Sequence, residues 1–373
     1  MRILALEPYY GGSHRGFLDG WIAHSRHRWA VLGLPAFKWK WRMRHAPITF
    51  ADEVAERVES GGAWDVVFCS DMLNLAEFRG LAPEPVRRLP TVAYFHENQL
   101  TYPIRSGGRR DHGPCMSNVT TALAADEAWF NSAFHRDEFL DAIPRFLDKL
   151  PDHQAELGTV VPRIRQHAAV HPPGIEPIDA AERVRDRAAA PLRILWAARW
   201  EFDKAPEVFF EAVRRLRERG IPFRLSVIGE QFRARPAVFD RAETEFAGLI
   251  DRWGYQESRA AYERALAEAD VVVSTALHEF FGISIVEAVA AGCYPVVPRR
   301  LAYPEVLGEL HAAGSGPYFY DGGAEELADL LASLAERDDL WQGDSARGVR
   351  AVSRYSWPTL APALDDAVQE AGR

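Results

Sequence analysis

Short apolar runs alternate with amphipathic stretches along most of the chain, and this alternation limits the folds that it can adopt. In the N-terminal half, the apolar runs have the length of strands that are buried on both faces. We expect these strands at residues 2–8, 29–35, 64–70, 91–96 and 128–131. Crossover helices are expected between them, at residues 14–27, 50–59, 74–81, 114–125 and 133–142. This order predicts a parallel sheet of the Rossmann type.

The alternation restarts after a polar passage that is rich in proline and alanine. Strands are expected there at 192–199, 223–229, 269–275, 294–298 and 317–320, and helices at 207–219, 258–267, 283–291 and 325–336. With 373 residues, the chain is long enough for two cores. We therefore predict an α/β protein with two Rossmann-like domains, 1–172 and 191–355, and a linker, 173–190. A helix in 356–373 is expected to pack back on the first domain, and 143–168 is interpreted as an insertion.

The composition excludes several classes of protein. Hydrophobic residues make up 47% and charged residues 26%, which is typical of a globular chain. The sequence contains no run of eighteen apolar residues, so no membrane span is predicted. The apolar run at the N-terminus is too short for the core of a signal peptide. Three cysteines far apart predict neither a disulfide framework nor a zinc site, so we expect a cytoplasmic protein. The net charge of −9 disfavours a general attraction to nucleic acid, although a local basic surface remains compatible with it.

Two acids stand seven residues apart around a predicted strand-to-helix turn. Gly282 lets a ligand approach the backbone, and the amides of Ile283 and Ser284 at the helix start would face a phosphate. Glu287, one turn later, would accept hydrogen bonds from ribose hydroxyls, and Glu279 would reach a sugar. A single acid at a helix start is often structural, but the whole string favours a site for a sugar diphosphate.

Two cations open the second predicted domain. Arg199 and Lys204 follow its first strand, and Lys204 is one of only four lysines among the 44 basic residues. Such cations would neutralise the negative charge that develops on a departing diphosphate, while the alternative is a solvated basic pair. No Asp-x-Asp sequence occurs, so the usual carboxylate clamp for a metal-bound nucleotide sugar is absent and no metal is expected.

Polar residues follow two strands of the first predicted domain. Gly11 and Gly12 form the first turn after a strand, with Ser13 and His14 behind them, and His96 ends a later strand. Either feature alone is also compatible with a purely structural turn or a buried structural histidine. A zinc protease is excluded, because His96-Glu and His278-Glu both lack the second histidine of the motif.

Aromatic and basic side chains alternate in residues 34–45. Four rings interleave with four cations there, and the residues proposed to contact a ligand are Lys38, Trp39, Trp41 and Arg42. Such a surface could stack on bases and pair with phosphates. The alternative places the tryptophans in a core with the arginine side chains extended to solvent.

The Glu-x7-Glu string, with Phe281-Gly282 after the first acid and Gly-x-x-Pro-Val-Val at 292–297, resembles glycosyltransferase family 4 of the GT-B fold. The resemblance implies two domains that face a central cleft and a retaining, metal-independent front-face transfer. It assigns catalytic roles to His96, Glu279, Arg199 and Lys204. It assigns nucleotide-sugar contacts to Gly11, Gly12, Tyr255, Gln256, Phe281, Gly282, Ile283, Ser284 and Glu287.

Several strings narrow the resemblance within that family. Tyr-Tyr-Gly-Gly-Ser-His, Leu-Pro-Ala-x-Lys-Trp-x-Trp-Arg and Tyr-Phe-His-Glu-Asn-Gln-Leu-x-Tyr-Pro resemble the tRNA-queuosine α-mannosyltransferases, over nearly the full length. That likeness implies GDP-mannose as the donor and queuosine in a tRNA anticodon as the acceptor. The acceptor contacts would be Ser13, His14, Lys38, Trp39, Trp41, Arg42, Asn98 and Gln99.

Two other functions remain open at this point. One is a retaining family 4 transferase that uses another nucleotide sugar and a lipid, saccharide or small-metabolite acceptor. The other is a GT-B scaffold that binds a nucleotide sugar or RNA without catalysis. No permanently bound cofactor is expected in any of the three cases, and the sequence favours no particular oligomeric state.

Overall fold

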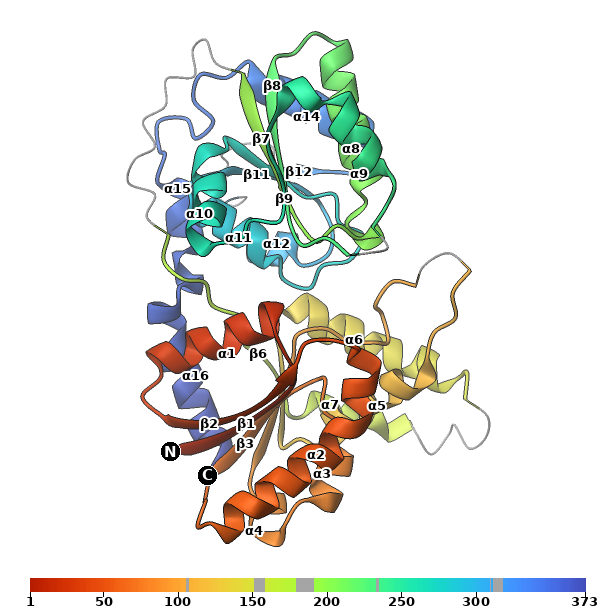
Figure 1. Cartoon of the computed structure of the whole chain (residues 1–373), viewed down its shortest axis with the longest axis vertical. Helices are drawn as coiled ribbons and strands as arrows, with labels where there is room; N and C mark the ends of the chain where they lie inside the picture. The colour runs from red at the N-terminus through yellow and green to blue at the C-terminus, as the bar shows by residue number, and fades with distance from the viewer. Residues whose placement is uncertain (105–106, 151–157, 179–190, 233–234, 309, 311–317) are drawn as a thin grey trace. The chain divides into compact units, whose positions relative to one another are not determined.

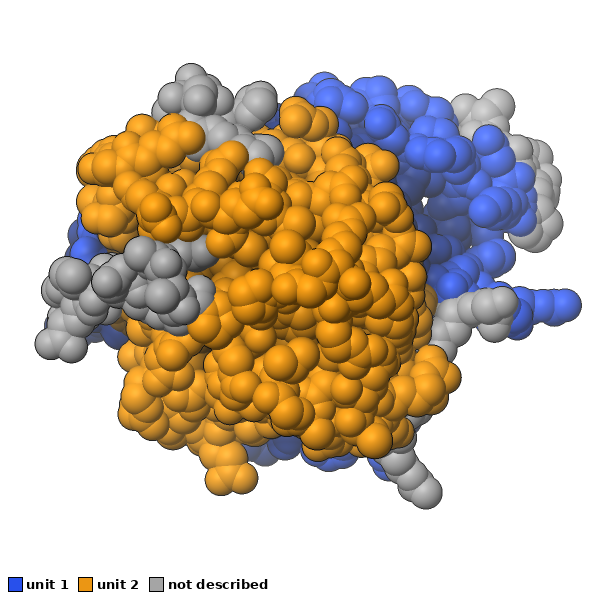
Figure 2. Space-filling view, turned by 90° about the horizontal axis from the view of Figure 1, so that it is seen from above, with its two compact units in different colours: residues 1–174, 357–373 blue, residues 175–356 orange. Residues whose placement is uncertain are grey.

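The computed structural model describes residues 1–104, 107–150, 158–178, 191–232, 235–308, 310 and 318–373. Its chain forms two compact units (Figures 1 and 2). Unit 1 contains Met1–Gly174 and Trp357–Arg373, and unit 2 contains Ile175–Ser356. The first border therefore falls two residues after the predicted one. Most of the predicted linker, residues 179–190, lies outside the described part.

Unit 1 is built on a six-stranded parallel sheet in the order β2-β1-β3-β4-β5-β6. Its strands are β1 (Arg2–Tyr10), β2 (Arg28–Pro35), β3 (Val66–Ser70), β4 (Thr91–Phe95), β5 (Glu127–Phe130) and β6 (Ala168–Val170). Its helices are α1 (Gly12–His24), α2 (Trp39–Glu59), α3 (Leu75–Leu81), α4 (Glu84–Arg87), α5 (His112–Ala124), α6 (Ala133–Leu147), α7 (Val160–Arg165) and α16 (Trp357–Ala371).

The two faces of this sheet carry separate apolar cores. Leu4 and Leu6 of β1 pack in the core that α2, α3, α5, α6 and α7 cover. Ile3 and Ala5 point to the opposite face, where α1 and α16 cover the sheet. This alternation follows from the period of two residues in a strand. Figure 1 shows α16, the last helix of the chain, beside α1.

Two expectations for unit 1 were wrong. Helix α2 begins at Trp39 rather than at residue 50, and its 21 residues include Pro47. Residues 143–168 are not simply an insertion, because α6 continues to Leu147 and α7 and the start of β6 also lie there. Residues 151–157 of that stretch lie outside the described residues. The remaining strands of this unit begin and end close to their predicted positions.

Unit 2 repeats the architecture with the strand order β12-β11-β10-β7-β8-β9, again all parallel. Its strands are β7 (Leu192–Ala197), β8 (Phe223–Ile228), β9 (Ile250–Gly254), β10 (Val271–Val273), β11 (Tyr294–Pro298) and β12 (Phe319–Tyr320). Its α-helices are α8 (Pro206–Glu218), α9 (Val238–Glu245), α10 (Arg259–Glu268), α11 (Ile283–Ala290), α12 (Tyr303–Val306), α14 (Ala324–Ala335) and α15 (Arg347–Val352). Short 3-10 helices are η2 (Phe202–Lys204), η3 (Ala247–Leu249) and η4 (Ser353–Tyr355).

Polar side chains fix where several helices begin. Asn74 accepts a hydrogen bond from the amide of Glu77 at the start of α3, and Ser258 accepts one from Ala261 at the start of α10. Such caps satisfy amides that have no partner within the helix. Of the helices in the described ranges, none has both the length and the apolar character needed to cross a bilayer.

Candidate functional site

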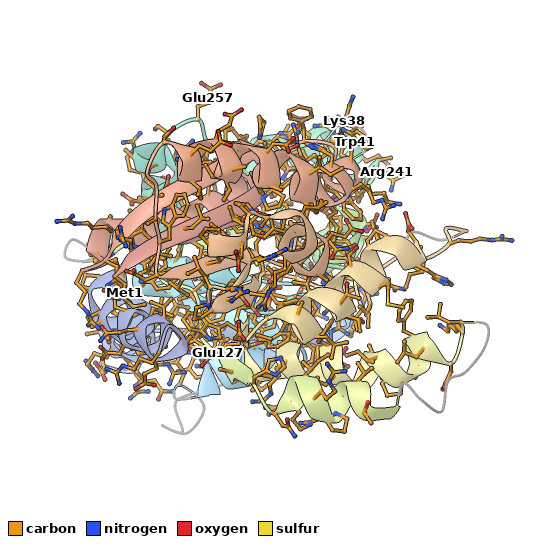
Figure 3. The ribbon with its side chains drawn as sticks, turned by 90° about the horizontal axis from the view of Figure 1, so that it is seen from below. Met1, Lys38, Trp41, Glu127, Arg241 and Glu257 are labelled. Atoms are coloured by element: carbon orange, nitrogen blue, oxygen red, sulfur yellow. The ribbon has the colours of Figure 1, made fainter. Side chains whose placement is uncertain are left out.

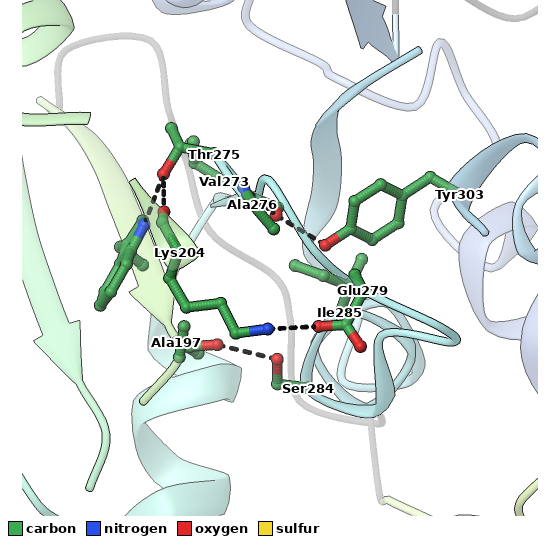
Figure 4. A pocket seen from close by; sticks show the side chains of 12 residues that line it. Ala197, Lys204, Val273, Thr275, Ala276, Glu279, Ser284, Ile285 and Tyr303 are labelled. Carbon is green, nitrogen blue, oxygen red and sulfur yellow. Dashed lines mark hydrogen bonds and ion pairs between the residues drawn. The ribbon is translucent and has the colours of Figure 1, made fainter. Parts of the chain in front are cut away.

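The repeated order of strand, turn and helix in unit 2 brings two of its loops to one edge of the sheet. Strands β7 and β10 are neighbours and run parallel, so the segments that follow them emerge side by side. Lys204 comes from the first of these segments, and Glu279 and Ser284 come from the second. All three line one small pocket, together with Tyr303 (Figure 4).

Lys204 is a buried cation held by two hydrogen-bond acceptors and a neighbouring carboxylate. Its Nζ donates to the carbonyl oxygen of His278 at 2.9 Å and to Glu279 Oε2 at 3.2 Å, and it lies 3.3 Å from Asp203 Oδ2. Burial acts to lower the pKa of Lys204, but the attraction of Glu279 and Asp203 outweighs burial and raises it. The ammonium group is therefore charged and fixed in direction.

Glu279 is the anionic partner in this pocket. Burial acts to raise its pKa, but the nearby Lys204 charge lowers it overall, and Arg199 contributes in the same direction. Arg199 itself has a largely exposed side chain, with Nη1 3.4 Å from Glu201 Oε2. The three predicted charges of unit 2 thus lie within mutual electrostatic range, with one cation buried and the other open to solvent.

The turn before α11 requires glycine for two reasons. Gly282 has a φ of 91°, and a Cβ there would lie 2.9 Å from Tyr303 Cε1. The amides of Ile283 and Ser284 follow in the first turn of α11, where amides have no acceptor within the helix. Ser284 Oγ donates to the carbonyl oxygen of Ala197 at 2.8 Å, which ties α11 to the end of β7. This helix start can accept an anion through its backbone.

The other residues predicted to contact the nucleotide sugar lie in different environments. Phe281 is buried with its ring edge-on to Tyr355, so only its backbone could face a ligand. Tyr255 is exposed after β9, and the Gln256 side chain donates to the Gly254 carbonyl oxygen. Glu287 is buried between α11 and α10, where Arg259 and Tyr262 donate to it.

Unit 1 gathers its predicted residues at the carboxyl ends of β1 and β4. His14 Nδ1 lies 3.2 Å from Glu7 Oε2, and the rings of His14 and His96 are tilted with centroids 4.0 Å apart. Glu7 Oε1 accepts further hydrogen bonds from the Tyr9 amide and from Ser70 Oγ. The Glu7 carboxylate is thus a fixed and almost fully buried acceptor.

The two histidines carry different charges. Burial acts to lower the pKa of His14, but Glu7 raises it to about 9. Burial and the positive charge of His14 hold the pKa of His96 well below its usual value. Burial is the main cause that raises the pKa of Asp71 to about 8. The Asp71 Oδ1 atom accepts a hydrogen bond from the His96 amide. At neutral pH the arrangement presents a neutral imidazole beside an imidazolium.

The remaining polar residues of this region are partly committed to the fold. Gly12 has a φ of 53° at the start of α1, and Ser13 is exposed beside it. Asn98 is fully buried, and its Oδ1 accepts from the amides of Leu100 and Thr101. The Gln99 side chain donates to Glu97. Asn98 therefore shapes the loop rather than offering its oxygen to an acceptor molecule.

The alternating aromatic and basic residues form the start of α2. Lys38 and Trp41 are exposed, and Figure 3 shows their side chains near one another. Trp39 is half-buried, whereas Arg42 is buried with its guanidinium 4.3 Å from the centre of the exposed Phe37 ring. The alternative with buried tryptophans and extended arginines is therefore wrong for Trp41 and for Arg42.

Among the described residues, one group of side chains could hold a metal ion. Glu7, His14 and His96 offer ligand atoms that all lie within 4.8 Å of one another. However, a metal would have to displace the proton that Glu7 stabilises on His14. The hydrogen bonds of Glu7 to Tyr9 and Ser70 also occupy one of its oxygens. A metal ion and a proton would therefore compete for this cluster.

Several residues of the two sites were not identified from the sequence. Asp203 is completely buried against Lys204, and Glu7 and Asp71 lie below the two histidines. The ring of Tyr303 packs against Gly282, and its hydroxyl is hydrogen-bonded to Ser274 Oγ at 2.6 Å. Of these residues, only Glu7 could have been identified from the sequence, because it is a charged residue near the end of an otherwise apolar strand.

Family models and related sequences match this chain along most of its length. The model for the tRNA-queuosine alpha-mannosyltransferase N-terminal domain matches residues 2–175, and the model for group 1 glycosyl transferases matches residues 191–337. The chain is 34% identical over 313 residues to the tRNA-queuosine alpha-mannosyltransferase of Drosophila melanogaster, which covers 82% of this chain and 81% of the relative. It is 28% identical over 253 residues to a GDP-mannose-dependent alpha-(1-6)-phosphatidylinositol dimannoside mannosyltransferase of Mycobacterium tuberculosis. That match covers 67% of this chain and 59% of the relative.

Solved structures share the fold at low sequence identity. Sucrose-phosphate synthase from Thermosynechococcus elongatus has a TM-score of 0.73 at 14% identity and covers 99% of each chain. Anabaena HepE in complex with UDP and glucose has a TM-score of 0.69 at 16% identity and covers 99% of this chain and 100% of the other. Together with the two parallel six-stranded sheets, this likeness confirms the predicted GT-B fold.

Proposed function

The chain belongs to the tRNA-queuosine alpha-mannosyltransferase family of glycosyltransferases, and from that premise we propose that it transfers mannose from GDP-mannose to queuosine in a tRNA anticodon. The observation that carries the donor half of this proposal is the pocket of Lys204, Glu279 and Ser284. It combines a fixed cation, an anion and a helix start within one unit.

We propose that this pocket stabilises the departing diphosphate. As the bond between the sugar C1 and the phosphate oxygen breaks, negative charge grows on that oxygen. Lys204, Arg199 and the amides at the start of α11 supply positive charge for it without any reorganisation of the protein. Glu279 would accept hydrogen bonds from hydroxyls of the transferred sugar.

The proposed transfer retains the configuration at C1. The acceptor oxygen bonds to C1 on the face from which GDP leaves, and the departing phosphate oxygen takes the proton of the acceptor hydroxyl. No covalent intermediate with the protein is formed. The neutral His96 of unit 1 is proposed to hold a sugar hydroxyl, because a neutral imidazole can both donate and accept.

We propose that the start of α2 contacts the tRNA. Trp41 and Phe37 are exposed aromatic rings, and Lys38 adds a positive charge beside them. Unpaired bases of an anticodon loop stack on such rings, and the local cation offsets the net charge of −9. We also propose a cytoplasmic location and a reaction without a metal cofactor. The buried cysteines Cys69, Cys115 and Cys293 form no disulfide bond within the described residues, which agrees with a reducing compartment.

The deciding experiment incubates the protein with labelled GDP-mannose and two tRNA preparations, one containing queuosine and one lacking it. We expect incorporation only into the tRNA that contains queuosine. Incorporation into both, or a preference for a lipid or saccharide acceptor, would assign a different acceptor to this transferase. Absence of both transfer and slow hydrolysis of GDP-mannose would instead support a non-catalytic scaffold.

A further inference from the structure

The carboxylate of Glu287 is held by two donors from the neighbouring helix α10. Arg259 Nη1 donates to Oε1 at 2.6 Å, and Tyr262 Oη donates to Oε2 at 2.7 Å. Glu287 is only 8% exposed, so its negative charge would be costly without a partner. The two donors compensate that charge and fix the plane of the carboxylate.

The two donors are themselves fixed. They lie three residues apart on α10, whose start is capped by Ser258 through a 3.1 Å hydrogen bond from the Ala261 amide. Arg259 Nε donates to Glu263 at 2.7 Å, and its guanidinium lies 5.4 Å from the centre of the Tyr262 ring. The frame around Glu287 is therefore complete in the absence of a ligand.

This frame leaves part of the carboxylate available. A carboxylate accepts about four hydrogen bonds, and the two donors of α10 use one position on each oxygen. One position on each oxygen remains, and two neighbouring oxygens match two neighbouring hydroxyl groups. Glu287 also lies four residues after Ile283, on the same face of α11, and side chains of a helix lean toward its N-terminus. Its side chain therefore lies on the face of α11 that begins at the amides proposed to bind a diphosphate.

We infer that Arg259 and Tyr262 are positioning residues that present Glu287 as the acceptor for both hydroxyls of a nucleotide's ribose. This inference rests on the proposed function, because it requires the diphosphate to bind at the start of α11. If either donor is lost, the carboxylate can rotate, and it then distinguishes ribose from deoxyribose less well.

The test compares the binding of GDP and 2′-deoxy-GDP to the full-length protein by calorimetry. We expect the wild type to bind GDP about tenfold or more tightly, since the lost hydrogen bond involves a charged acceptor. Tyr262→Phe removes one hydroxyl without changing the ring, and Arg259→Met removes the charge while keeping the length of the side chain. Each substitution should bring the ratio of the affinities for GDP and 2′-deoxy-GDP closer to one, mainly because GDP binds more weakly. Arg259→Lys should restore part of the preference.

Arg264→Met is the matched control, because Arg264 is an exposed arginine on the same helix. It should leave the preference for GDP unchanged. If the wild type binds GDP but shows no preference over 2′-deoxy-GDP, or if the variants weaken both nucleotides equally, the positioning role is refuted while the donor site stands. If the wild type binds neither nucleotide, the proposed donor site fails and the inference fails with it.

Discussion

Lys204 is a buried side chain to which we assign a role in the proposed transfer. Two hydrogen-bond acceptors and the Asp203 carboxylate surround its ammonium group, so the charge is stabilised before any substrate binds. A diphosphate would add a further anionic partner at the point where charge develops during the reaction. The Asp203 carboxylate, which has no solvent exposure, keeps the ammonium directed into the pocket.

Replacing Lys204 with alanine should therefore slow the transfer strongly. We expect the barrier to rise by about 3 kcal/mol, which is the usual effect of deleting one partner of transition-state charge. The measurement is the single-turnover rate with labelled GDP-mannose. Lys149→Ala, which removes an exposed lysine of unit 1, is the control and should not change the rate. A fall of less than threefold for Lys204→Ala would remove this residue from the mechanism.

Glu7 controls the charge of His14, and this can be measured directly. Burial alone would lower the pKa of His14, and Glu7 raises it to about 9. Because that value lies above the ordinary 6.5, the pair stabilises the folded protein fully below about pH 6.5. This stabilisation is lost as the pH rises through about 9.

In Glu7→Gln, the pKa of His14 should fall from about 9, because the largest contribution that raises it is removed, and NMR of the imidazole protons follows this change. Urea unfolding should show that the wild type loses up to about 3 kcal/mol of this contribution between pH 6.5 and 9, whereas the variant does not. Ser70→Ala is a useful comparison, because it removes a hydrogen bond to Glu7 but not the charge. An unchanged pKa of His14 in Glu7→Gln would show that Glu7 is not the cause.

At the scale of elements, regular apolar periodicity was sufficient to predict most strands and the helices between them. The exceptions have physical reasons. The aromatic and basic residues at the start of α2 and its internal Pro47 concealed a helix, although Met43, Ala46, Phe50 and Val54 are buried at helical spacing. Strand β9 was missed because it is a short, partly exposed edge strand with charged residues. The glycine turn before α11 was predictable because its φ and its contact with Tyr303 require glycine.

The exposed start of α2 supports a prediction about the acceptor. Trp41 is 62% exposed, so Trp41→Ala should hardly change the stability of the fold. If the ring stacks on a base, the change should weaken tRNA binding by about 1–3 kcal/mol and leave the hydrolysis of GDP-mannose intact. The readouts are KM for tRNA and the hydrolysis rate.

Ile48→Ala is the matched control for Trp41→Ala. Ile48 lies on the same helix and is 57% exposed, but it has no aromatic ring. We expect its KM for tRNA to remain within twofold of the wild type. Equal effects of the two substitutions would point to general apolar contact rather than stacking, and no effect of either would remove this surface from the acceptor site.

At the scale of the whole molecule, the sequence was sufficient to predict the architecture and the residues proposed to contact substrate. It was not sufficient to predict the residues that hold those side chains in place. Lys204, Glu279 and His96 could be found because they stand in recognisable strings next to strands. Asp203, Arg259 and Tyr262 act through contacts that only the folded chain creates. A residue that positions another by packing leaves no local pattern.

The distribution of charge also leads to a prediction for the whole enzyme. The sequence contains no Asp-x-Asp clamp, and in the proposed donor site Lys204, Arg199 and the start of α11 would supply the positive charge for the diphosphate. Extensive treatment with EDTA, followed by its removal, should therefore leave the rate of mannosyl transfer within about twofold of the untreated enzyme, because the protein's own charges supply the stabilisation. Readdition of Mg²⁺, Mn²⁺ or Zn²⁺ should produce no recovery beyond that range. A large loss that one of these ions restores would contradict the metal-free mechanism, and the Glu7, His14 and His96 cluster would then be the first place to look for the ion.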